Sequence, residues 1–134
     1  MSINVNEIIN IRLEKAEETL NAAMELSNKG HTTSVINRVY YACFYAVNAL
    51  ILTGGYSSSK HSGVRSLFNQ HFVRTGLVDG KWGRFYSDLY TKRQKGDYED
   101  LVKFTTREED EILEKAKIFI AEIKKITLNH IGKI

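Results

Sequence analysis

Four polar or aromatic residues in the middle of the chain have types that bind nucleotides. They are Arg38, Tyr41, Tyr45 and Asn48. Intervals of three, four and three residues place them on one face of a helix. Arginine holds phosphate through paired N–H donors, and tyrosine rings stack on bases. This face therefore favours contact with a nucleotide or RNA.

A second group of candidates, Arg93, Asp97 and Tyr98, follows near the end of a later helical pattern. Arg93 continues an apolar stripe, and a buried guanidinium needs either a carboxylate or the mouth of a cleft. Asp97 is the nearest carboxylate along the chain. If the two helices are neighbours, both groups form a clamp for a phosphodiester and a stacked base. The alternative is a buried polar network that only fixes the packing.

The usual catalytic and metal-binding motifs are missing from the sequence. It contains no Gly-rich phosphate loop, no Ser/His/Asp order and no zinc spacing. His61 and His71 are ten positions apart, which does not fit a helical metal pair. We therefore predict no metal and no cofactor. Cys43 lies in an apolar segment, where a small buried hydrophobe is expected rather than a nucleophile.

Composition indicates one globular domain inside the cell. The 134 residues are 43% hydrophobic and 26% charged, and they contain no proline. A single cysteine and the lack of a leader pattern predict a reducing, cytoplasmic setting. The net charge is only +3, but residues 60–95 hold eight Lys or Arg against two Asp. This uneven distribution suits a phosphate-bearing partner.

Apolar periodicity predicts five helices that position these residues. The central one, Ser34 to Leu52, is apolar on nearly every side. Because three polar residues interrupt it, we expect it to pack among helices and not to span a membrane. The other four are expected from Val5 to about Lys29, from about Lys60 to Gly76, from Lys81 onward, and after Thr105 and Thr106. The predicted fold is all-α, an up-and-down four-helix bundle with an additional fifth helix.

The last helix has a strong start signal. Thr105 with Glu108, and Thr106 with Glu109, both have the spacing of a capping box.

Three segments together resemble a known family. They are Asn37-Arg-Val-Tyr-Tyr-Ala-Cys-Phe-Tyr45, Lys60-His-Ser-Gly63 and Leu89-Tyr-Thr-Lys-Arg-Gln-Lys-Gly-Asp-Tyr98. In this order they resemble the small stand-alone HEPN proteins, and the match covers nearly the whole chain. The resemblance implies that residues 1–134 form a single HEPN-like helical domain that forms a homodimer. It also implies a minimal nucleotidyltransferase as partner in a toxin and antitoxin pair, with RNA cleavage by some members.

The chain departs from the pattern of the RNA-cutting members, in which histidine follows arginine after four to six residues. Arg93 fits the arginine, but Tyr98 stands where the histidine is expected. A tyrosine with a pKa of about 10 is a poor general base. His61 could take that role from another helix, so the catalytic candidates are Arg93, Tyr98 and His61, none of them firm.

We therefore expect a HEPN-like dimer that binds a nucleotide or RNA, or partners a nucleotidyltransferase, with Arg93 and Arg38 contacting phosphate. The alternatives are a metal-independent ribonuclease toxin and a non-catalytic helical interaction module.

Overall fold

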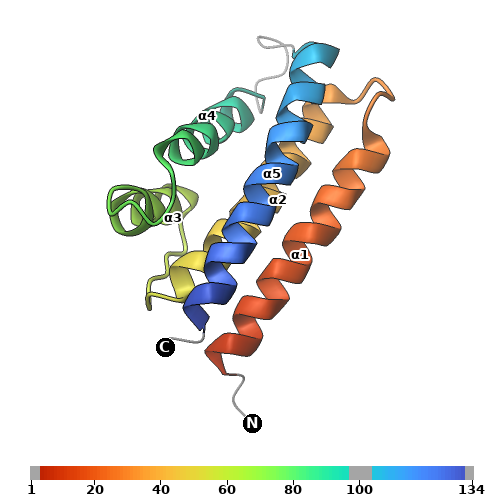
Figure 1. The fold of residues 1–134 in the computed structure, drawn as a ribbon. Helices are drawn as coiled ribbons and strands as arrows, with labels where there is room; N and C mark the ends of the chain where they lie inside the picture. Colours follow the sequence, from red (N-terminus) through yellow and green to blue (C-terminus); the bar gives the residue numbers. More distant parts are fainter. Residues whose placement is uncertain (1–3, 97–103, 132–134) are drawn as a thin grey trace.

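The computed structural model describes residues 4–96 and 104–131, and these residues form helices without any strand. In chain order the elements are α1 (Val5–Leu26), α2 (Thr32–Leu52), α3 (His61–Phe68), a π-helical turn η1 (Asn69–Val73), α4 (Gly80–Gly96) and α5 (Thr106–Ile131). The predicted all-α fold with five helices is confirmed. Helix α1 runs antiparallel to α2 and α5, while α3 and α4 lie on the side of α2 away from α1 (Figure 1).

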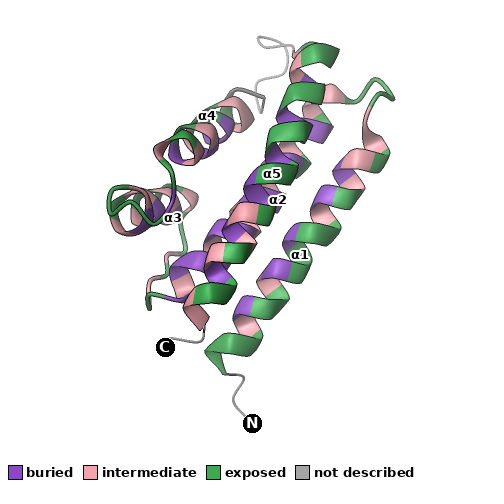
Figure 2. Ribbon diagram, in the orientation of Figure 1, coloured by how far each residue is buried: buried purple, intermediate pink, exposed green. Residues whose placement is uncertain are grey.

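Helix α2 is the centre of the molecule and packs against each of the other α-helices. Eleven of its 21 residues are buried, and the buried positions face several neighbours (Figure 2). The three polar residues do not by themselves exclude a membrane span, because α2 is long and apolar enough to cross a membrane by length and composition, with a mean hydropathy of 1.4. However, 61% of that stretch is buried inside the fold, as in the core helix of a bundle.

The turn between α1 and α2 is anchored by a buried carboxylate. Glu109 of α5 is only 1% exposed and accepts hydrogen bonds from Ser27 Oγ at 3.1 Å and from the Asn28 N–H at 3.0 Å. Asn28 has a φ of 63°, so the chain already turns there. Helix α1 therefore ends at Leu26, three residues before the predicted end at Lys29.

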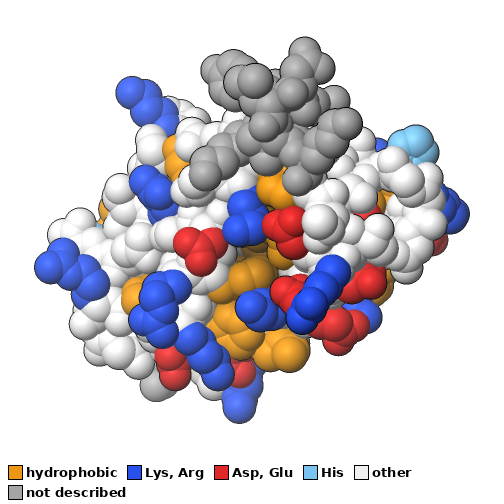
Figure 3. Space-filling model, turned by 90° about the horizontal axis from the view of Figure 1, so that it is seen from above, with side chains coloured by type: hydrophobic (Ala, Val, Ile, Leu, Met, Phe, Trp, Pro, Cys, Tyr) orange, Lys and Arg blue, Asp and Glu red, His pale blue; other side chains and the backbone are white. Residues whose placement is uncertain are grey.

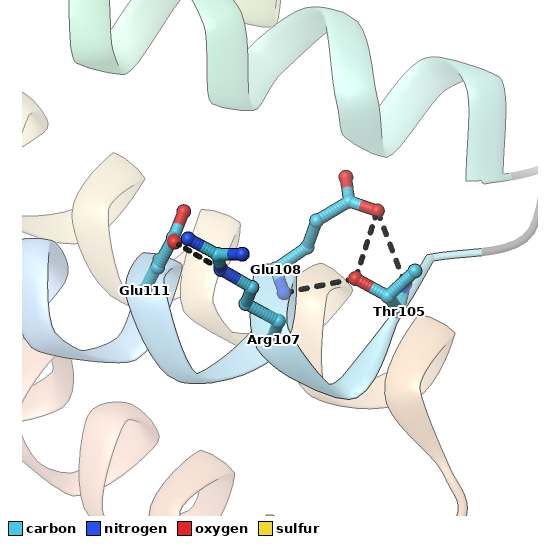
Figure 4. Close-up of polar contacts among 4 residues, drawn as sticks. All are labelled: Thr105, Arg107, Glu108 and Glu111. Carbon is cyan, nitrogen blue, oxygen red and sulfur yellow. Dashed lines mark hydrogen bonds and ion pairs between the residues drawn. The ribbon is translucent and has the colours of Figure 1, made fainter.

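Only one of the two predicted capping boxes forms at the start of α5. The Glu108 N–H donates to Thr105 Oγ1 and the Thr105 N–H donates to Glu108 Oε1, both at 3.1 Å (Figure 4). The second box, Thr106 with Glu109, is wrong because Glu109 turns inward to hold the α1–α2 turn.

The third predicted helix is interrupted. Helix α3 ends at Phe68, and η1 continues with a wider turn in which the Arg74 N–H donates to the Asn69 carbonyl at 2.9 Å. A Cβ added to Gly83 of α4 would lie 2.8 Å from Val73 Cγ1. Glycine at this position therefore lets α4 approach η1 closely.

Candidate functional site

A cluster of aromatic and cationic side chains forms where α2, α3 and α4 meet. Tyr40, Tyr41 and Phe44 come from the middle of α2, His61 is the first residue of α3, and Arg93 lies in the last turns of α4. We call these five residues the Arg93–His61 cluster. Because three helices contribute to it, the cluster depends on the fold and not on a local motif.

His61 is held in a fixed place by α2. Its Nδ1 forms a 2.8 Å hydrogen bond with the Tyr40 hydroxyl, and its ring stacks on Phe44 with 4.3 Å between centroids. Tyr41 meets the same imidazole edge-on at 5.6 Å. With Nδ1 engaged by Tyr40, the second ring nitrogen, Nε2, is left for a ligand.

Arg93 lies over two tyrosine rings. Its guanidinium carbon is 5.1 Å from the ring centroid of Tyr40 and 5.5 Å from that of Tyr41. These distances are within the range of cation–π attraction. Its Nε is buried and has no hydrogen-bond partner among residues 4–96 and 104–131. Among the described residues, the faces of the two tyrosine rings therefore orient Arg93, and its Nε donor has no partner.

Burial and neighbouring charge tune the cluster's titratable groups. Partial burial, and then the Arg93 charge, lower the pKa of His61 below its usual value. Burial raises the pKa of Tyr40 to about 12, against smaller opposing effects of Tyr86 and Arg93. Near neutral pH the structure therefore favours neutral imidazole and a protonated phenol.

The Lys60-His-Ser-Gly63 segment positions His61 through its glycine. Ser58 Oγ accepts a 3.2 Å hydrogen bond from the Lys60 N–H just before α3. A Cβ added to Gly63 would lie 2.8 Å from Ser58 Cβ and would clash with its Oγ. Glycine at position 63 thus allows the turn that presents His61 to Tyr40.

The structure separates the residues that the sequence grouped together. A hollow of about 360 Å³ lies beside the Arg93–His61 cluster. It is lined by Thr19 of α1 and by five residues of α2, Ser34, Asn37, Arg38, Tyr41 and Tyr45. Arg93 is not among its lining residues, so Tyr41 alone belongs to both places. Asn48 lies on the same partly exposed stripe of α2. Asp97 and Tyr98 lie outside the described residues.

Sequence reasoning missed the functional potential of Tyr40 and Phe44. Apolar periodicity places both among the core residues of the central helix, and Tyr40 is indeed fully buried. Its hydroxyl nevertheless contacts His61 from a helix 21 residues away in sequence. The available signal was the concentration of four aromatic residues, Tyr40, Tyr41, Phe44 and Tyr45, in the central helix.

Two other surface features are less suited to binding phosphate, because they carry charges of both signs. A hollow of about 190 Å³ between α4 and α5 carries both signs of charge, from Asp88, Lys92, Glu108, Glu111 and Lys115. Figure 3 shows that the face seen from above mixes basic and acidic side chains around hydrophobic surface. Within residues 4–96 and 104–131, no three His, Cys, Asp or Glu side chains gather as a metal site would require.

Comparison with known proteins gives one consistent family. The family model described as HEPN domain matches residues 9–126. A protein of Thermotoga maritima named only as a UPF0332 protein is 41% identical over 90% of this chain and 91% of its own length. Two proteins of Methanocaldococcus jannaschii, each named "putative toxin", are 33% and 35% identical, over 87% and 91% of this chain and 80% and 90% of their own lengths.

Proposed function

Because the chain belongs to the HEPN domain family, we propose that it binds RNA or a nucleotide through the Arg93–His61 cluster. The observation that carries this proposal is Arg93 itself. Its guanidinium lies on two tyrosine rings, and its buried Nε has no partner in residues 4–96 and 104–131. An arginine that serves only the packing would be expected to use its donors on the protein.

The chemistry of the cluster suits a phosphodiester next to a sugar and a base. Arg93 supplies several N–H donors in a planar fork that fits two phosphate oxygens. When the Tyr40 hydroxyl donates to Nδ1, His61 carries its proton on Nε2 and adds a neutral donor. Tyr41, which is partly exposed, offers a ring on which a base can stack.

The test is binding of fluorescently labelled RNA by the intact protein and by Arg93→Gln, with a chelator present. We expect the variant to bind about tenfold more weakly, the effect of losing hydrogen bonds to a charged group. Arg107→Gln is the matched control, because Arg107 is 89% exposed on α5 and pairs with Glu111 of the same helix. Equal affinities for the wild type and both variants, or no binding to any RNA or nucleotide, would refute the proposal.

A second candidate function, metal-independent RNA cleavage, is favoured by the position of His61 beside Arg93. If Nδ1–H donates to the Tyr40 oxygen, Nε2 carries a lone pair, and the lowered pKa of His61 keeps it free to accept a proton. The imidazole would take the proton of a ribose 2′-hydroxyl, whose oxygen attacks the neighbouring phosphorus and breaks its bond to the 5′-oxygen, which leaves as a hydroxyl after taking a proton from water. Arg93 would stabilise the charge that develops on phosphate.

The two functions are distinguished by product. End-labelled RNA incubated with the protein and a chelator yields a 2′,3′-cyclic phosphate end only if cleavage occurs. Loss of that product in His61→Gln, with RNA binding retained, supports cleavage. RNA that remains intact while bound leaves the binding function alone. Tyr98 lies outside the described residues, so Tyr98→Phe is the variant that tests its candidate catalytic role.

The relatives named as putative toxins support a role in a toxin and antitoxin pair. We propose a minimal nucleotidyltransferase as the protein partner and a homodimer as the functional unit, as the family resemblance implies. Light scattering of the purified chain tests the dimer. Copurification with a coexpressed nucleotidyltransferase encoded beside it tests the partner, and a monomer that binds no such enzyme would overturn both.

A further inference from the structure

A groove between α1 and α2 adjoins the Arg93–His61 cluster and has its own cations. On the α2 side it follows the stripe Arg38, Tyr41, Tyr45 and Asn48. It includes the hollow of about 360 Å³ in which Arg38, Tyr41 and Tyr45 meet Thr19. Tyr41 connects this groove to Arg93, whose guanidinium carbon is 5.5 Å from the Tyr41 ring centroid.

The α1 side of the groove adds two cations that sequence patterns did not single out. Lys15 Nζ lies 5.1 Å from the Tyr45 ring centroid. Arg12 is three residues before Lys15, and Thr19 is four residues after it, so the three share one edge of α1. Packing of Leu13 with Ala49 puts Arg12 at about the level of Asn48. Arg12 Nε is buried without a partner in the described part of the chain.

The hollow within the groove is lined by positive charge and by no negative charge. The six residues that line it include Arg38 but no Asp or Glu. Of the nearby acidic residues of α1, Glu17 pairs with Lys124 of α5, and Glu18 is exposed three residues after Lys15. By contrast, the hollow between α4 and α5 combines three carboxylates with two lysines. Cations that alternate with tyrosine rings suit a flexible polyanion that carries bases.

We propose that this groove binds single-stranded RNA as a continuation of the strand held by the Arg93–His61 cluster. The inference rests on the proposed function, and it deepens that function from a phosphate site to a site for several nucleotides. The stripe from Arg38 to Asn48 is ten steps along α2 and rises by about 15 Å. That length accommodates about four stacked nucleotides at roughly 3.4 Å each. Tyr41 and Tyr45, with centroids 6.4 Å apart and planes tilted by 40°, provide successive stacking surfaces.

Length dependence is the first test. Anisotropy titrations use labelled dinucleotide, tetranucleotide and octanucleotide RNA with 2′-fluoro sugars, which cannot be cleaved at the 2′-oxygen, together with an RNA hairpin stem. We expect affinity to rise at least tenfold from the dinucleotide to the tetranucleotide and then level off, with weaker binding of the stem. A dinucleotide that binds as tightly as the octanucleotide would overturn the groove while leaving the proposed function intact.

Charge removal in the groove is the second test. The double variant Lys15→Gln, Arg38→Gln should bind the octanucleotide about tenfold more weakly and the dinucleotide within twofold of wild type. The slope of log affinity against log salt concentration should become shallower by about 1.4, because two phosphate contacts are lost. The double variant Arg107→Gln, Lys125→Gln is the matched control, because it also removes two positive charges, but from exposed positions of α5. Equal effects of the two double variants would overturn the proposal.

A second copy of the chain is the competing occupant of the same groove. Light scattering of the Lys15→Gln and Arg38→Gln double variant separates the two occupants. If the variant changes from dimer to monomer and binds the octanucleotide with unchanged affinity, the groove is an interface between two copies of the chain and the proposal is wrong. If no RNA or nucleotide binds the wild type at all, the proposed function fails first.

Discussion

Two polar residues, the buried Glu109 and the partly exposed Arg93, are treated in opposite ways by the fold. Glu109 of α5 is only 1% exposed, and its carboxylate accepts hydrogen bonds from Ser27 and Asn28 of the α1–α2 turn. Arg93 lies over two tyrosine rings, and its Nε has no partner in residues 4–96 and 104–131. A polar group satisfied by the chain holds the fold together, whereas one with spare donors is available to a ligand.

The largest expected effect is on stability, at Glu109. Glu109→Ala removes the acceptor for two donors in the α1–α2 turn and leaves a cavity, so we expect the free energy of unfolding to fall by about 2–4 kcal/mol. Urea denaturation followed by circular dichroism measures it. RNA affinity of the folded fraction should stay within twofold of wild type. A loss below about 1 kcal/mol would mean that Glu109 does not anchor the turn.

Arg93→Ala should produce the opposite pattern. We expect an unfolding free energy within about 1 kcal/mol of wild type, because the described residues supply no ion pair to break, together with about tenfold weaker RNA binding. Denaturation and anisotropy on the same preparation measure both. A loss of several kcal/mol with unchanged RNA binding would make Arg93 part of a packing network and remove the contrast with Glu109.

The sequence predicted the elements well because each helix carries its own apolar periodicity. Central α2, the cap at Thr105 and the inward direction of Arg93 all follow from local spacing. Local spacing could not predict that α1 ends at Leu26, because the turn there depends on Glu109 from a helix about 80 residues later.

The candidate site was predicted less completely for the same reason. Arg38, Tyr41 and Tyr45 share one face of α2 as predicted, but which helix meets that face is decided by packing. Thr19 and Lys15 of α1 cover one edge, while Arg93 and His61 approach the other. The hydrogen bond between Tyr40 and His61 joins two of the segments that carry the family resemblance, but their spacing along the chain does not predict this contact.

Tyr40→Phe tests whether the Arg93–His61 cluster, like Glu109, also contributes to the stability of the fold. The change leaves His61 Nδ1 without its hydrogen bond and should lower the free energy of unfolding by about 1 kcal/mol. RNA affinity should fall by about threefold, because His61 is then held only by ring contacts with Phe44 and Tyr41. Nitrogen NMR of the imidazole gives an independent measure through its tautomer. An unchanged tautomer ratio would show that Tyr40 does not orient His61.

The smallest expected effect is the pH dependence of His61. Its pKa is lowered in the folded state, so the unfolded chain binds the proton more tightly. The stabilising contribution of neutral His61 is therefore fully present above the unfolded value of about 6.5 and is lost as pH falls through the lower folded value. Wild type should lose slightly more thermal stability than His61→Gln between about pH 7.5 and pH 5.

RNA binding should respond to the same protonation with the opposite sign. Protonated His61 adds a positive charge beside Arg93, so wild-type affinity should rise toward acid pH more than the affinity of His61→Gln. Bound RNA should in turn raise the pKa of His61, and NMR titration of the imidazole with and without RNA measures that shift. An imidazole pKa that is unchanged by RNA would place the bound phosphate away from His61. In that case Arg93 would contact RNA without the histidine.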